Sequence, residues 1–524
     1  MDAQSISKDD IKEIDIHDLS DESHKEFATV DERKLLWKID IHVIPWLAVL
    51  YLLNFLDRGS IGNAKLYNLE KSINITDKQY LIALTVFFFP YSLLEPLSNV
   101  FLRRFKPSIY LSSMMLAWGI VMTFHGVVKN YGGLITVRVL LGATEAGLYP
   151  GIVFYITSWY KSSEMGSRVA VFFSSATVAG AFSGLLATAI SNMDGVGGKS
   201  GWEWIFILEG LATIVVAFAS YWVIQDFPTT AKFLTEKERR FVVRRLKQDM
   251  RLSAGGEHFQ LKYVRQSLAD WKTWIAMGIY MGFDGPLYAF SLFLPSIINQ
   301  LGRARPLLHL VYILTYFIMP SVTGFKANVA NLLSVPVYAW GCFMTCVIGF
   351  LGDRLGSRRY INYALFGTGL VAYVILIAST TPALSYFAVY LAVSAIYPTI
   401  PNSVAWVASN VEGSYKRAVT LGMAIGFGNI NGAITANIYR AKDKPWYRLG
   451  HGIVLAYIAI GFICSFIFAV LLKRENDRRD RGERDEIIRG IDNDNGREQN
   501  GTYSSVEEAQ KEKGDAWSGF RYTL

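Results

Sequence analysis

Long apolar runs separated by short polar segments fill most of the chain. Six runs of about 20 residues, the length that a helix needs to cross a bilayer, precede a polar centre, and six more follow it. The first six lie at 41–62, 79–101, 109–128, 131–158, 169–191 and 204–225, and the second six lie at 273–299, 329–351, 360–380, 383–407, 418–438 and 452–473. The pattern predicts an all-α polytopic membrane protein with twelve transmembrane helices in two six-helix halves.

The polar segments divide the chain into five parts. These are a cytoplasmic N-terminal tail (1–38), an N-terminal six-helix half (39–226), a cytoplasmic central loop (227–272), a C-terminal six-helix half (273–473) and a cytoplasmic C-terminal tail (474–524). In the central loop, the spacing of apolar and basic residues over 235–252 predicts an amphipathic helix lying on the cytoplasmic leaflet. The C-terminal tail has many charges of both signs and few aromatic residues, which predicts disorder.

Composition and charge agree with a membrane protein. Hydrophobic residues make up 52% and charged residues 18% of the 524 residues, whereas a soluble protein has about 25% charged residues. The net charge of +8 suits basic loops that anchor spans, so we expect no nucleic-acid partner. Lys and Arg are roughly twice as frequent in the short loops on the N-terminal side of the membrane as in the opposite loops, which predicts that both termini are cytoplasmic. Asn74, in the sequon Asn74-Ile75-Thr76, is then external and is a glycosylation candidate.

Common enzymatic and metal-binding motifs are absent from the sequence. The three cysteines, Cys342, Cys346 and Cys464, lie in apolar runs and form no CxxC pair. The seven histidines show no HExxH spacing. We therefore expect no enzyme activity, no metal site and no cofactor.

Ionisable residues occur inside the first and fourth apolar runs, where charges are costly and usually functional. Arg58 can hold a carboxylate through two hydrogen bonds, and the adjacent Asp57 can exchange a proton. Arg138 and Glu145 lie two helical turns apart on one face of the fourth run. We expect Arg58 to bind substrate and Asp57, Glu145 and Arg138 to serve proton coupling. The alternatives are that Asp57 and Arg58 neutralise each other or point outward, and that Arg138 and Glu145 are a structural pair.

Other runs contribute polar and aromatic candidates for the substrate site. Asp284 precedes a Gly-Pro pair in the seventh run, so it is either a cavity residue at a broken helix or a cap at a helix end. Asn429 places an amide at cavity depth in the eleventh run. Tyr149, Tyr288 and Phe290 are candidates for packing against the substrate.

A candidate gate follows the second span of the second half. The segment GFLGDRLGSRR (349–359) combines Gly349 and Gly352, which allow close helix contact, with Asp353 and Arg354 in a short loop. Asp353 can pair with a basic residue or a helix end across the bundle and so hold one conformation. The alternative, a basic anchor with turn glycines, does not explain Asp353 or the glycine spacing.

The chain resembles the fungal anion:cation symporter branch of the major facilitator superfamily, which includes allantoate, nicotinate, pantothenate and biotin permeases. The resemblance covers about residues 35–475 and is carried by LDRGSIGNA (56–64), EPLSN (95–99), RVLLGATEAGLYPG (138–151), WYKSSEMGSR (159–168), GWEWIFILEG (201–210), FPTTAKFLTEKE (227–238) and IYRAKDKPWYRLGHG (438–452). It implies pseudo-symmetric halves, alternating access and proton-coupled uptake at the plasma membrane. It also implies that Asp57, Arg58 and Glu145 are coupling and anion-site residues, that Arg138 is the arginine of the fourth span, and that Asp353 is the gating aspartate.

One segment, residues 303–324, departs from this family pattern. Members usually pass almost directly from the seventh span into the eighth, whereas here RARPLLHLVYILTYFIMPSVTG intervenes. The 22 residues correspond to 66 nucleotides at three per residue, about the length of a short fungal intron. We therefore hypothesise a retained or mispredicted intron. The alternative is an extra external hairpin, whose apolar part is too short to span and would lie on the membrane.

We therefore predict a secondary transporter that uses the proton gradient to import a small carboxylate, nicotinate-like acids first and allantoate-like or pantothenate-like acids next. Its partners would be the organic anion, protons and membrane lipid, and we expect it to function as a monomer. Two alternatives stay open. One is export of a pathway metabolite through the same fold, and the other is a membrane nutrient sensor that does not transport.

Overall fold

The structure is a computed structural model that describes residues 30–102, 105–161, 164–249, 261–301, 328–440, 443, 446–489 and 496–524. Residues 303–324, the segment that departs from the family pattern, lie outside the described residues. The intron and the hairpin therefore both stay hypotheses.

The first half consists of long helices at the six expected positions. They are α2 (Glu32–Leu66), α4 (Asp77–Leu102), α5 (Pro107–His125), a fourth span made of α6 (Tyr131–Glu145) and α7 (Leu148–Thr157), α8 (Met165–Ser191) and α9 (Gly201–Val223), with a short α3 (Leu69–Ser72) after α2. The fourth span is interrupted at Gly147, where an added Cβ would overlap Ser98 Oγ of α4. Glycine at this position therefore lets α4 approach the interrupted backbone closely.

The second half repeats this plan. It contains α12 (Trp271–Leu301), α14 (Asn328–Leu355), α15 (Arg358–Ala378), α16 (Pro382–Ser409), α17 (Ser414–Thr435) and α18 (Arg448–Asp480). Ten segments among the described residues are long and apolar enough to cross a membrane. Helices α4 and α12 occupy the other two expected spans, and both pack against α17. The predicted all-α fold of two six-helix halves is confirmed.

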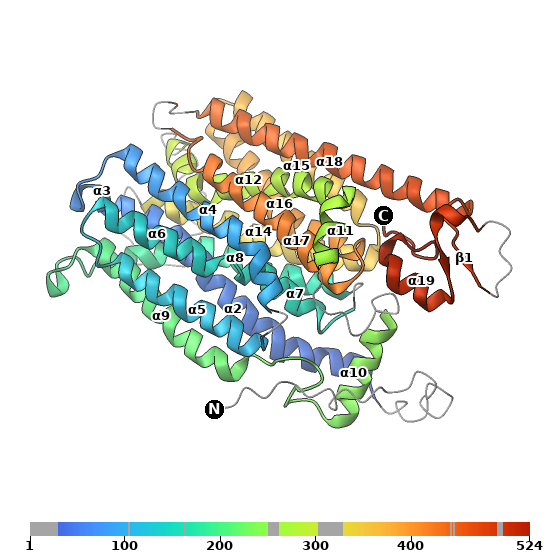
Figure 1. The fold of residues 1–524 in the computed structure, drawn as a ribbon. Coiled ribbons are helices and arrows are strands. Elements are labelled where there is room, and N and C mark those ends of the chain that lie inside the picture. Colours follow the sequence, from blue (N-terminus) through green and yellow to red (C-terminus); the bar gives the residue numbers. More distant parts are fainter. Residues whose placement is uncertain are drawn as a thin grey trace.

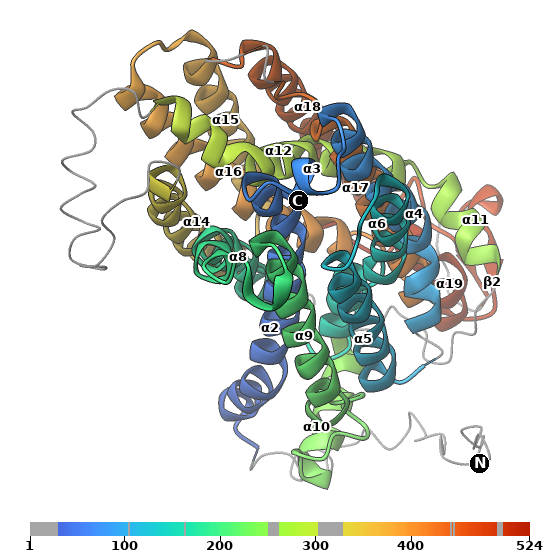
Figure 2. The ribbon, with the colours of Figure 1, turned by 90° about the vertical axis from the view of Figure 1, so that its left-hand side faces the viewer.

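The two halves meet along two pairs of helices. Figure 2 shows the helices of the first half mainly in the lower part and those of the second half mainly in the upper part. Helix α8 packs against α14, and α4 packs against α17. Each pair joins one helix from each half, so the space between the pairs is enclosed by both halves.

Local capping explains where several helices begin. Asp31 accepts hydrogen bonds from the backbone N–H groups of Arg33 and Lys34 at the start of α2. Ser200 and Glu203 form a capping box at the start of α9. Such side chains satisfy the first N–H groups of a helix, which have no partner inside the helix.

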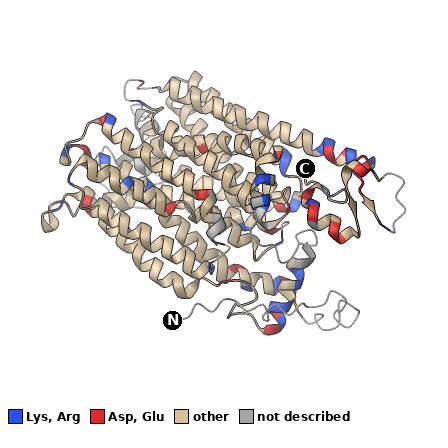
Figure 3. Ribbon diagram, viewed as in Figure 1, with Lys and Arg blue, Asp and Glu red and all other residues tan. Residues whose placement is uncertain are grey.

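Charged residues gather at one end of the bundle, which holds α10 (Glu236–Asp249), α11 (Leu261–Ala269) and the C-terminal segment (Figures 1 and 3). We call this end the linker side and the other end, near α3, the opposite side. The middle of the bundle has few charges in the ribbon view of Figure 3. This distribution is the one expected when the linker side faces an aqueous compartment.

The amphipathic helix expected at 235–252 is present as α10, but its apolar face packs on protein. Val242 is fully buried and Leu246 is nearly so. Arg245 contacts Glu32 at 2.6 Å, and Lys38 contacts Glu238 at 2.8 Å. These ion pairs attach α10 to the start of α2. The expectation that the helix lies on the leaflet is therefore wrong, because its apolar residues join the protein core.

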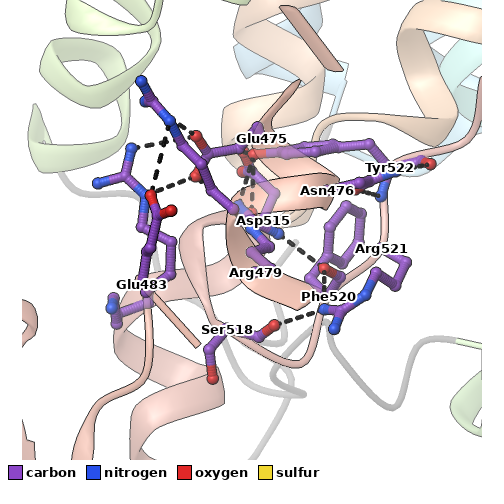
Figure 4. Close-up of polar contacts among 12 residues, drawn as sticks. Glu475, Asn476, Arg479, Glu483, Asp515, Ser518, Phe520, Arg521 and Tyr522 are labelled. Atoms are coloured by element: carbon purple, nitrogen blue, oxygen red, sulfur yellow. Dashed lines mark hydrogen bonds and ion pairs between the residues drawn. The ribbon is translucent and has the colours of Figure 1, made fainter. Parts of the chain in front are cut away.

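The C-terminal tail is folded in its described part, and the prediction of disorder is wrong there. After α18 the chain forms a two-stranded parallel sheet of β1 (Ile487–Ile488) and β2 (Thr502–Tyr503), followed by α19 (Val506–Lys513). The Arg479 guanidinium donates to the carbonyl oxygens of Phe520 and Asp515 (Figure 4). Asn476 exchanges two hydrogen bonds of 2.9 Å with the backbone of Tyr522. The last residues are thus fixed to the end of α18.

Ion pairs explain why the described part of the C-terminal tail is folded. The Asp515 carboxylate is 1% exposed and lies 2.5 Å from Lys272 Nζ and 2.8 Å from Lys416 Nζ. Burial raises the pKa of Asp515, but the two ammonium groups outweigh burial and lower this pKa to about 2. The charges of the tail predicted disorder, but Asp515 forms ion pairs with lysines near the starts of α12 and α17.

Candidate functional site

A small cavity lies between the halves. Its lining is dominated by aromatic rings and consists of Tyr51, Phe55, Arg58, Tyr91, Tyr149, Phe173, Tyr280, Phe283, Asp284, Leu287, Tyr288, Ile400, Ile425 and Asn429. The five residues predicted to bind substrate, Arg58, Tyr149, Asp284, Tyr288 and Asn429, all line it. Phe290 is not among the lining residues and packs instead against Tyr338 and Tyr397.

Arg58 is the cation of this cavity. Its Nε lies 3.1 Å from Glu145 Oε2, and its Nη1 donates to the Tyr288 hydroxyl at 2.8 Å. Its guanidinium carbon sits 4.6 Å from the centre of the Tyr91 ring, a cation–π contact. Glu145 is fully buried and also accepts from Asn54 Nδ2 at 3.0 Å. Its other oxygen has no hydrogen-bond partner among the described residues. Arg58 and Glu145 are therefore brought together.

A chain of hydrogen bonds continues from Arg58 across both halves. The Tyr288 hydroxyl donates to Asn429 Oδ1 at 2.5 Å, and Asn429 Nδ2 donates to Glu95 Oε2 at 2.8 Å. Glu95 is fully buried on α4. The chain therefore leaves the first half at Arg58, passes through Tyr288 and Asn429 in the second half, and returns to the first half at Glu95.

Asp284 faces the cavity from the second half. It is 7% exposed, and no hydrogen bond or ion pair links it to another described residue. Helix α12 continues through Gly285 and Pro286 to Leu301. Asp284 thus lies in the cavity lining, whereas the expected break in the helix is absent from α12. Gly285 faces the Tyr457 ring of α18, which explains why a small residue occurs there.

Asp57 and Arg138 lie away from the cavity lining. Asp57 Oδ2 accepts from Trp118 Nε1 at 2.6 Å and from Thr213 Oγ1 at 3.3 Å, so it points into the first half between α5 and α9. Arg138 is 3% exposed, and two of its guanidinium nitrogens lack a hydrogen-bond partner in the described structure. The structural pair of Arg138 with Glu145, which was the alternative reading, is not formed among the described residues. Glu145 pairs with Arg58 because the Arg58 side chain reaches it from α2.

The candidate gate joins the halves at the linker side. Asp353 Oδ2 accepts from the backbone N–H of Ser167 at 2.6 Å, and Asp353 Oδ1 lies 2.5 Å from Arg358 Nη2. Ser167 lies in the first turn of α8, where unpaired N–H groups attract an anion. The expected contact of Asp353 with a basic residue and a helix end is therefore present. The basic partner is Arg358, whereas Arg354 is exposed and has no ion pair with a described residue.

Glycines let the helices of the two halves touch at the gate. An added Cβ on Gly349 would overlap Ala170 Cβ of α8 in the first half. Gly352 faces its own half instead, where an added Cβ would lie 3.2 Å from Asn402 Oδ1 of α16. On the opposite side, Asn437 Nδ2 donates to Thr85 Oγ1 at 3.1 Å. The halves are thus in contact on both sides of the cavity.

Asn74 lies in the turn between α3 and α4 at the opposite side. It is exposed and has a positive φ of 55°. Asparagine tolerates this left-handed conformation better than most residues. The side chain is accessible for modification, and its glycosylation stays a prediction.

Several buried polar residues at or near the site were not predicted from the sequence. Glu95 was visible as a carboxylate within an apolar run, and it belongs to the quoted EPLSN motif. Glu209 had the same signal within GWEWIFILEG. It is 4% exposed on α9 and accepts from the Ser60 hydroxyl. Asn54 lies one helical turn before Arg58, which was the available signal for its role beside Glu145.

Comparison with known proteins agrees with this architecture. The model of the Major Facilitator Superfamily matches residues 47–436. A High-affinity nicotinic acid transporter of Saccharomyces cerevisiae is 30% identical over 453 residues, which cover 86% of this chain and 79% of the relative. The MFS-type transporter cnsO of Penicillium expansum is 32% identical over 466 residues, which cover 86% of each chain.

Solved structures share the fold. A bacterial homologue of the human lysosomal transporter Spinster, in an inward-facing and unoccupied conformation, matches with a TM-score of 0.53 and 15% identity. The match covers 82% of this chain and 98% of the bacterial protein. With the family match over most of the bundle, these findings show that the chain belongs to the major facilitator superfamily and is a membrane transporter.

Proposed function

We propose that the protein is a proton-coupled symporter that imports a small organic anion by alternating access. The observation that carries this proposal is the buried ion pair between Arg58 and Glu145 at a cavity between the halves. The same proposal includes the plasma membrane, cytoplasmic termini, a monomer surrounded by lipid, and a proton gradient in place of a cofactor.

The ion pair supplies a mechanism for coupling. While Glu145 is ionised, it neutralises the only cationic side chain that lines the cavity within the described residues. Protonation of Glu145 leaves Arg58 free to hold a substrate carboxylate through its guanidinium fork. Proton binding and anion binding therefore assist each other, and this assistance is reciprocal.

The aromatic lining of the cavity favours a small, flat acid. Aromatic rings from both halves surround Arg58, and such rings pack well against planar groups. The High-affinity nicotinic acid transporter of yeast makes nicotinate the first candidate substrate. Allantoate and pantothenate are the next candidates.

Uptake of labelled nicotinate and a panel of organic acids, measured against external pH, tests the proposal. We expect accumulation to rise as external pH falls. We also expect Glu145→Gln, which imitates the protonated form, to lose concentrative uptake and pH dependence while it keeps exchange of substrate across the membrane. The matched control is Asp77→Asn, which alters an exposed carboxylate on the opposite side.

The outcome separates the alternatives. Efflux of a panel acid, driven by an inward proton gradient and without uptake, would favour export. No flux in either direction by wild-type protein at the cell surface would contradict transport of these acids and favour sensing. Uptake that is unchanged in Glu145→Gln would contradict the role of the ion pair.

A further inference from the structure

We propose that the substrate carries an N–H donor group in addition to its carboxylate, and that Asp284 binds this group. The substrate class is then small amphoteric or amino-bearing acids. Of the candidates named above, allantoate and pantothenate carry an N–H group, whereas the ring nitrogen of nicotinate is an acceptor at neutral pH, so the inference ranks nicotinate below them. This inference rests on the proposed function, because Arg58 must hold the carboxylate end.

The first observation is that Asp284 lacks a partner while it lines the cavity. It is more than nine-tenths buried, and no hydrogen bond or ion pair joins it to another residue in the described ranges. A buried carboxylate without a partner is costly. A ligand that brings a donor removes this cost, and a ligand without one leaves it in place.

The second observation is the space made for this carboxylate. Gly428 of α17 faces Asp284, and an added Cβ there would lie 2.5 Å from Asp284 Oδ2. Any larger residue at this position would push the carboxylate aside. The glycine therefore keeps Asp284 in the cavity wall.

The third observation is that three of the residues with donor groups in the cavity lining have other acceptors. The Tyr288 hydroxyl donates to Asn429, and Asn429 Nδ2 donates to Glu95. Arg58 is occupied by Glu145 and Tyr288. The hydroxyls of Tyr149 and Tyr280 also line the cavity, and neither has a hydrogen-bond partner among the described residues. Asp284 is therefore unpaired although these hydroxyls share its cavity.

The arrangement gives the cavity two poles. Arg58 supplies a guanidinium group from the first half, and Asp284 supplies a carboxyl group from the second half, in a lining that consists mainly of aromatic rings. A molecule with a carboxylate at one end and an N–H group at the other matches both poles. A simple acid matches one pole and places an apolar end against the carboxylate of Asp284.

Binding of matched acids to the purified full-length protein tests the inference. The pairs are 4-aminobenzoate with benzoate and 4-aminobutyrate with butyrate, and binding is followed by ligand-induced thermal stabilisation. In wild type we expect the amino member of at least one pair to bind about tenfold more tightly or better, since a site built for a hydrogen bond rejects analogues that lack it. Asp284→Asn is expected to remove most of this preference.

Two further variants keep the test decisive. Gly428→Ala is expected to reduce the preference by displacing the carboxylate, which provides a second reading if Asp284→Asn fails to fold. Asp77→Asn is the control and is expected to keep the wild-type preference.

Each outcome has one meaning. Equal binding within both pairs by wild type, or a preference that survives in Asp284→Asn, would overturn the inference and leave anion transport standing. Loss of preference in both cavity variants, with the simple acids still bound, supports it. Failure of wild type to bind any of these acids, together with absent uptake of the wider panel, would overturn the proposed function as well.

Discussion

The Asp353 carboxylate in the second half accepts a hydrogen bond of 2.6 Å from the backbone N–H of Ser167 in the first half. Arg358 holds the same carboxylate from the other side at 2.5 Å. Asp353 therefore acts on two elements at once, because it caps α8 and pairs with the start of α15.

Asp353→Asn is expected to open the linker side. A hydrogen bond to a charged group contributes about 1.5–3 kcal/mol, and each 1.4 kcal/mol changes a ratio of states about tenfold. Spin labels at Lys34 and Tyr360, in a cysteine-free background, should report a longer distance between the halves. Arg354→Gln is the control, since Arg354 is exposed and has no ion pair with a described residue, and it should leave the distance unchanged. Equal effects of the two variants would contradict this account.

Gly349→Ala is expected to reduce the initial rate of transport at least several-fold. The added methyl group would overlap Ala170 Cβ and separate α8 from α14. Ala170→Gly in the same protein should restore much of the rate, because it removes the opposing methyl group. Gly367→Ala provides the control, since an added Cβ there meets no atom within 4 Å. A double variant no better than Gly349→Ala would show that the overlap is not the cause.

Arg58→Lys is expected to weaken substrate binding about tenfold or more, although the positive charge is kept. Lysine lacks the planar fork that serves Glu145 and Tyr288 at the same time. Concentration-dependent uptake measures the change, and Arg33→Lys, at an exposed position, serves as the control. Wild-type affinity in Arg58→Lys would mean that the guanidinium does not hold the substrate.

The Asp515 contacts should persist throughout the physiological pH range. The pKa of Asp515 is lowered from 3.8 to about 2. Its ionised form therefore stabilises the fold above pH 3.8, and this contribution is lost as pH falls through about 2. At 1.36 kcal/mol per pKa unit, the contribution is about 2 kcal/mol. Hydrogen exchange of the backbone amides of residues 514–524 should be slow. After correction for intrinsic exchange rates, the protection of these amides should not change between pH 8 and pH 5. Exchange should be faster in Asp515→Asn.

Asn74→Gln is expected to remove an endoglycosidase-sensitive mobility shift on a gel. The prediction requires the opposite side to face the lumen of the secretory pathway during synthesis. Thr76→Ala should have the same effect, since it destroys the sequon and keeps Asn74. A shift that persists in both variants would place the modification elsewhere, and no shift in wild type would contradict glycosylation at this site.

The apolar pattern predicted most of the fold, because each span must satisfy its backbone internally and bury a recognisable face. It failed where charged residues pair over long sequence distances. Asp515 meets Lys272 and Lys416 in space, and no local signal in the tail identifies those partners. The apolar face of α10 was visible in the sequence, but whether it meets lipid or protein depends on where Glu32 and Lys38 lie.

The sequence predicted which residues belong to the candidate site better than it predicted which of them are in contact. Charges inside apolar runs identified Arg58, Glu145 and Asp284, because charge is rare at that depth. Helical periodicity placed Arg138 on the same face as Glu145, whereas the structure pairs Glu145 with Arg58 from another helix. Pairing between helices depends on their packing, which periodicity within one helix does not contain.

The position of the Arg58–Glu145 pair also bears on how fast an unloaded carrier can reorient. Both residues belong to the first half, so the pair moves with that half and is not broken by rocking of the halves. The hydrogen-bond chain crosses between the halves at Arg58–Tyr288 and at Asn429–Glu95. Rocking of the empty carrier must stretch these two hydrogen bonds, whereas charge separation between Arg58 and Glu145 adds nothing to the barrier of the return step.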